Sequence, residues 1–119
     1  MTEADLQDLF APVGPVAVRR MFGGFGVYRD GRIFAVVVGD ELYLKVDEKT
    51  EAEFRAAPSV QWVYEKGEKT VKMPYWRLPP DAYDDTGILA HYAELAFAAA
   101  ARAGTPKRAK KTVPRKGKT

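Results

Sequence analysis

The amino-acid sequence predicts an α+β fold with an antiparallel sheet, in the order α-β(3-4)-α-β(2)-α. Three observations predict it. From 16 to 46, apolar and polar residues alternate with a period of two between glycine-containing turns. Two further alternating runs, at 60–64 and 71–75, flank a Lys-Gly-Glu turn. A short apolar stripe of helical spacing precedes the sheet region, and a long one occupies about 84–103.

The first helix is expected to begin at Thr2, whose hydroxyl can accept from free backbone N-H groups. Leu6, Leu9 and Phe10 then form its apolar stripe, and Pro12 ends it.

The meander that follows is divided by turn formers at 23–24, 30–31 and 39–40. Residues 42–46 alternate as a strand does when one face is buried. Residues 33–38 are apolar on both faces, which predicts a central strand.

Asp47 is expected to cap a second helix that ends before Pro58. In the last strand, Pro74 lacks a ladder donor, which predicts an edge position or a bulge. Adjacent strand residues point to opposite faces, so we expect Tyr75 to point inward and Trp76 to be available to a partner.

The final helix is followed by Gly104 and Pro106 as stop signals, which divides the chain into a folded domain at 1–104 and a basic, disordered tail at 105–119. The tail has no acidic residue and carries seven basic ones: Lys107, Arg108, Lys110, Lys111, Arg115, Lys116 and Lys118. Residues 1–104 therefore hold 12 basic against 16 acidic residues, and the folded domain is net negative although the chain is net +3.

A chain of 119 residues can bury one hydrophobic core, so we expect one domain. It has no cysteine, no apolar stretch long enough to cross a bilayer, and an acidic rather than basic N-terminus. We expect a cytoplasmic protein without a membrane partner.

Residue types that carry catalysis are scarce. The glycines at 23–26 lack the further glycine of a dinucleotide fingerprint, because Arg29 stands in its place; their expected use is a turn or bulge. His91 is the only histidine and is expected on the flank of a helix. We therefore predict no catalytic, cofactor or metal residue and no enzyme activity.

Two sets of residues in the folded domain are candidates for contact with a protein or nucleic acid. The first is basic: Arg19, Arg20, Arg29 and Arg32. Neighbours in a strand point to opposite faces, so at most one of Arg19 and Arg20 belongs to a flat patch; the alternative is solvated or ion-paired structural arginines.

The second candidate set combines Tyr43, Lys45 and Trp76, within a larger group of strand aromatics on which nucleic-acid bases could stack. The alternative is that most of these rings belong to the core, since aromatic residues bury large areas.

Several separated motifs then stand in a fixed order along the chain: Arg19-Arg20-Met21-Phe22-Gly23-Gly24-Phe25-Gly26-Val27-Tyr28, Asp30-Gly31, Phe34-Ala35, Leu42-Tyr43-Leu44-Lys45-Val46-Asp47, Met73-Pro74-Tyr75-Trp76 and Leu78-Pro79. Together they resemble the N-terminal domain of the TfoX/Sxy regulators of bacterial natural competence, over about residues 1–103.

The resemblance implies a two-layer α/β fold with an antiparallel sheet, similar to that of secretion chaperones, and a regulatory rather than catalytic role. Full-length members of that family carry a second, helical domain and promote competence gene expression together with the cyclic-AMP receptor protein. Here a basic tail stands in place of the second domain, so we expect a stand-alone version.

The sequence thus favours a non-catalytic regulatory domain that acts on transcription of competence-type genes through protein partners; a homodimer is one assembly it leaves open. The alternative is a stand-alone nucleic-acid-associated protein that binds DNA without sequence preference through its tail.

Overall fold

A computed structural model describes residues 1–21 and 23–104. Three α-helices lie at α1 (Glu3–Phe10), α2 (Glu51–Ala56) and α3 (Thr86–Arg102). Six strands lie at β1 (Ala17–Met21), β2 (Gly24–Arg29), β3 (Arg32–Val38), β4 (Glu41–Lys45), β5 (Gln61–Lys66) and β6 (Lys69–Arg77). Short 3-10 helices follow α1 at Ala11–Val13 and precede α3 at Pro80–Tyr83.

The six strands form one antiparallel sheet in the order β1-β2-β3-β4-β6-β5. The predicted α+β class and element order are confirmed. As expected from its apolar residues, β3 is an inner strand, and four of its residues in succession are buried.

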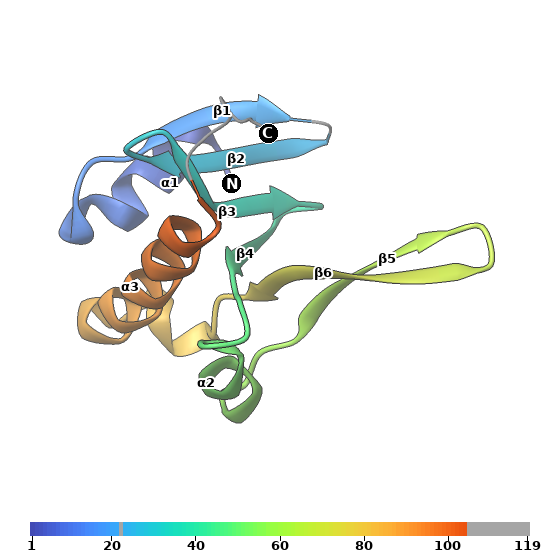
Figure 1. Cartoon of the computed structure of the whole chain (residues 1–119). Helices are drawn as coiled ribbons and strands as arrows, with labels where there is room; N and C mark the ends of the chain where they lie inside the picture. The colour runs from blue at the N-terminus through green and yellow to red at the C-terminus, as the bar shows by residue number, and fades with distance from the viewer. Residues whose placement is uncertain (22, 105–119) are drawn as a thin grey trace, which may run out of the picture.

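The helices form a layer against one face of the sheet, and in Figure 1 α1 and α3 lie on the same side of it. Phe34 of β3 joins these elements, because its ring meets Phe10 of α1 at 5.2 Å and Phe97 of α3 at 4.7 Å, both edge-on. Phe54 of α2 packs against Tyr92 of α3 at 5.1 Å.

A bulge in β3 directs Phe34 into this core. Val27 pairs with Ala35 and Tyr28 pairs with Ile33, so Phe34 is one extra residue in β3. A bulge lets two successive side chains leave the same face of a strand. Phe34 and Ala35 are accordingly both fully buried in the one core cluster.

The backbone conformation and close packing at 23–26 require glycine, which agrees with the structural role expected from the sequence. Gly23 has a φ of +68°, in the left-handed region. A Cβ on Gly24 would lie 1.7 Å from the Val37 carbonyl oxygen, so no other residue fits there. A Cβ on Gly26 would meet the Met21 Sδ atom at 2.6 Å.

The helix starts are partly as predicted. Thr2 caps α1, accepting from the Asp5 N-H at 3.1 Å in a capping box. Asp47, however, does not cap α2. Its carboxylate accepts from the N-H groups of Lys49 and Thr50 in the preceding turn, and the helix begins only at Glu51.

The β5–β6 hairpin projects from the sheet as an arm, seen at the right of Figure 1. Residues 63–72 of this arm are all exposed, because β4 pairs only with Tyr75 to Arg77 of β6. The pairing of β5 with β6 is irregular between Gln61 and Val63, opposite Pro74, which agrees with the predicted bulge. Among the described residues, no helix has the length and apolarity needed to cross a membrane.

Candidate interaction surface

The face of the sheet opposite the helices is called here the open face. Residues paired across neighbouring strands share a face, and one such row runs through Arg19, Gly26, Val36, Tyr43 and Arg77. None of these five belongs to the core cluster that packs against the helices.

Three aromatic rings gather on the open face where β4, β5 and β6 meet. The rings of Tyr43 and Trp62 stack at 5.8 Å, and those of Trp62 and Tyr75 lie 6.2 Å apart. The Lys45 Nζ atom lies 5.6 Å from the centre of the Tyr75 ring. Tyr43, Trp62 and Lys45 are only partly buried, so the group presents apolar area beside a cation.

Burial shapes the electrostatics of this group. Desolvation lowers the pKa of the Lys45 ammonium from its usual value, because burial disfavours the charged form. Burial also raises the pKa of the Tyr75 hydroxyl. The neighbouring Arg77 is already paired, with its Nε atom 3.1 Å from the Glu41 Oε1 atom.

At the β1 edge, the open face is basic and apolar. The Arg19 guanidinium lies 5.7 Å from the centre of the Tyr28 ring. Met21 is 45% exposed, and its sulfur lies over Gly26. The lack of a side chain at Gly26 leaves room for the side chains of Met21, Tyr28 and Ile33 to lie above it.

The four candidate arginines do not form one patch. Arg19 is on the open face, whereas Arg20 pairs with Phe25 and lies 5.9 Å from its ring, on the other face. Arg29 and Arg32 flank the β2–β3 turn and line a pocket against α3. The expectation that Arg19 and Arg20 point to opposite faces holds.

Trp76 is the candidate whose predicted orientation is wrong. It pairs with Leu44, which is fully buried under the helices, and it is itself only 6% exposed within the core cluster. Tyr75 lies on the open face, where neighbouring side chains leave it only 8% exposed, so its predicted burial holds although its predicted face does not. Trp76 cannot contact a partner directly, while Tyr43 and Lys45 remain candidates.

The fold also brings Trp62 and Tyr28 to the open face. Trp62 belongs to the larger group of strand aromatics that the sequence suggests, whereas Tyr28 is not among the candidates. In the sequence, Trp62 falls two positions before Tyr64, and Tyr28 follows Gly26 by two positions. This two-residue spacing indicates which strand residues share a face, but it does not show which strands lie next to each other in the sheet. The tail candidates at 105–119 lie outside the described residues.

His91 lies on the exposed flank of α3, as expected, with its Nε2 atom 2.8 Å from the Glu53 Oε1 atom. In the part of the chain that the structure describes, no three metal-ligating side chains gather in one place.

These features define a class: a two-layer α+β domain whose antiparallel sheet has one face under helices and one open face bearing aromatic and basic residues. The chain belongs to the TfoX N-terminal domain family, since residues 8–100 match the sequence model of that family. It is also 31% identical over 72 residues to Protein Sxy of Escherichia coli (strain K12). That match covers 60% of this chain and 34% of the relative, so the chain matches about a third of the relative's length.

Proposed function

We propose that this domain is a regulatory interaction module that binds a protein partner through its open face and acts in the transcriptional control of competence-type genes. Membership of the TfoX N-terminal domain family supports a regulatory role. The observation that supports the binding surface is the aromatic group of Tyr43, Trp62 and Tyr75 on the sheet face opposite the helices (Figure 1).

The composition of the open face favours a protein as the ligand. Aromatic residues and arginine are enriched in protein interfaces, because they bury large area with few rotatable bonds and still offer polar groups. Lys45 and Arg19 add positive charge beside the rings. A partner with acidic side chains around an apolar centre matches this arrangement.

The test uses the two neighbouring arginines of β1 as a matched pair. Arg19→Glu places a negative charge on the open face, whereas Arg20→Glu makes the same change at a site that is also exposed but lies on the other face. In a pull-down from native cytosol treated with nuclease, we expect Arg19→Glu to lose the partner and Arg20→Glu to retain it.

Loss of the partner in both variants, or in neither, would contradict the assignment to the open face. A partner recovered only without nuclease would instead favour the second function, non-specific DNA binding. The seven basic residues at 105–119 support that alternative, because cations on a chain without acidic residues bind phosphates regardless of sequence.

A further inference from the structure

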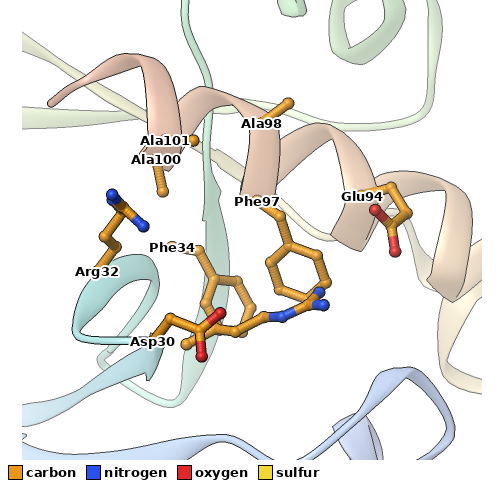
Figure 2. Close-up of a pocket in the computed structure, with 9 residues that line it drawn as sticks. Asp30, Arg32, Phe34, Glu94, Phe97, Ala98, Ala100 and Ala101 are labelled. Carbon is orange, nitrogen blue, oxygen red and sulfur yellow. The ribbon is translucent and has the colours of Figure 1, made fainter. Parts of the chain in front are cut away.

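A pocket of about 320 Å³ lies between the β2–β3 turn and the C-terminal half of α3, away from the open face. Figure 2 shows Arg32 at one end, Glu94 at the other, and the rings of Phe34 and Phe97 between them. Its volume is at the lower end of the range for small-molecule sites. Its lining combines aromatic rings with charged groups, as in many such sites.

The pocket exists because α3 presents small residues there. Ala98, Ala100 and Ala101 line it from the helix and leave its volume unfilled. Its wall toward the core is the fully buried Phe34. Because neighbouring side chains already cover the Phe34 ring, the apolar surface left for a ligand is that of Phe97 and of the alanines on α3.

One polar atom in this lining needs an acceptor. The Arg32 Nε atom is buried, and no group among the described residues accepts a hydrogen bond from it. The buried Arg77 Nε atom also lacks a well-aligned hydrogen bond, but it has the Glu41 carboxylate at 3.1 Å. Arg32 has no carboxylate within ion-pair distance in the described chain. A buried donor without an acceptor is costly and is normally satisfied by solvent or a ligand.

A second cation, Arg29, also lines the pocket. The Arg29 guanidinium lies 4.0 Å from the centre of the Phe97 ring, the shortest cation-π distance in the described chain. It takes part in no ion pair with the described residues. Arg29 therefore contributes positive potential from a position fixed by the ring.

Asp30 and Glu94 also line the pocket, so the two cations are balanced by two carboxylates. A ligand with several negative charges would be repelled by those carboxylates, whereas a single carboxylate can reach Arg32 without a large net charge. We infer that this pocket binds a small organic monocarboxylate with an apolar body. Its carboxylate accepts from Arg32, and its body packs against Phe97 and the alanines of α3.

The direct test is NMR of the full chain with phenylacetate as the probe and phenylacetamide as its neutral counterpart. We expect phenylacetate to shift the Arg32 Nε-H resonance in a saturable way, with a Kd of about 1 mM for a ligand of this size. The amide lacks the charge and should bind about tenfold more weakly.

Two variants locate the binding. Arg32→Gln removes the guanidinium, and Ala101→Leu fills the pocket from an exposed helix position, so the core is not crowded. Each should weaken phenylacetate binding about tenfold or more, whereas Arg20→Gln, outside the pocket, should leave it unchanged. The backbone amide spectrum of each variant checks that it is folded.

The inference is wrong if phenylacetate produces no saturable shift, if acid and amide bind equally, or if a folded Ala101→Leu variant binds as the unmodified chain does. The first result would mean that solvent alone satisfies Arg32. These outcomes are independent of the open face, so they leave the proposed partner binding untouched.

Discussion

At the scale of single residues, Trp76 shows how one position in a strand decides between core and surface. It lies beside Leu44 in the sheet, and the Arg55 guanidinium of α2 lies 5.3 Å from the centre of its ring. Its neighbour Tyr75 emerges on the open face, where Trp62 contacts it. The two tryptophans of the chain thus lie on opposite faces of one sheet.

We predict that Trp76→Ala lowers the free energy of unfolding by about 3–5 kcal/mol, because it leaves a cavity under the helices. Trp62→Ala should cost clearly less, since solvent can enter the space on the open face. Urea unfolding followed by circular dichroism measures both changes. Equal losses in the two variants would contradict the assignment of the faces.

The orientation of Tyr75 and Trp76 could not be predicted because the alternation of β6 is not continuous. Val71, Met73 and Tyr75 form a period-two run, which suggested that Tyr75 belongs to a buried face. In the structure Val71 lies on the arm and is 39% exposed. The irregular pairing opposite Pro74 separates the arm from the sheet, so the pattern on one side does not carry over to the other.

At the scale of elements, two polar side-chain contacts join α3 to the segment between β4 and β5. The Arg102 Nε atom in its last turn donates to the Asp47 Oδ2 atom at 2.6 Å, and His91 meets Glu53 of α2. Arg102 is the main reason that the pKa of the Asp47 carboxyl is lowered. These contacts hold the helix against the chain that leaves the sheet.

The Asp47 pair predicts a pH dependence of stability. With the pKa of Asp47 lowered in the folded state, the unfolded chain binds the proton first as the pH falls. The contribution of the pair is therefore present above about pH 4, the usual aspartate pKa, and is lost as the pH falls through the lower folded value. Asp47→Asn removes the charge while keeping an oxygen that can accept from the turn.

Urea midpoints of the unmodified chain and of Asp47→Asn, measured from pH 7 to pH 2, test this directly. The two curves should differ near neutral pH and converge in acid. Asp8→Asn, at an exposed position of α1 with no ion pair among the described residues, is the control. If the difference in urea midpoint between the two chains stays constant at all pH values, the Asp47–Arg102 ion pair is not its cause.

Much of the fold was accessible from sequence because local chemistry decides it. Thr2 and the acidic residues Glu3 and Asp5 after it identify a helix start. The apolar run at 33–38 identifies an inner strand. The start of α2 was placed too early because Asp47 is a good cap in isolation, and only the folded chain shows it used in a turn and paired with Arg102.

At the scale of the whole molecule, we expect residues 1–104 to fold without residues 105–119. The last helix ends at Arg102, and Gly104 has a φ of +101°. We predict that removing 105–119 leaves the melting temperature nearly unchanged but abolishes DNA binding, because the remaining 1–104 is net negative.

Titration of both chains with duplex DNA at several salt concentrations measures this. Contact of all seven tail cations with phosphates would give a slope of log K against log salt of about −6, and partial contact a shallower one. Binding by 1–104 alone, or a clear sequence preference, would move DNA recognition into the folded domain.

The open face was less predictable than the fold, because it is assembled from distant parts of the chain. Tyr43 and Lys45 were selected for their alternation, but Trp62 reaches them only through the strand order β4-β6-β5. Arg29 and Arg32 looked like part of one basic surface with Arg19. The β2–β3 turn instead carries them to the helix side, where they line the pocket.

The arm also determines where the chain can be interrupted. Its tip at Gly67 separates 1–66, which holds β1 to β5, from 68–104, which holds β6 and α3. Each fragment would lack half of the core, because the Phe34 ring on one side needs Phe97 on the other. The tip is therefore a natural position for splitting the protein into two halves that report, by reassembling, when fused partners come together.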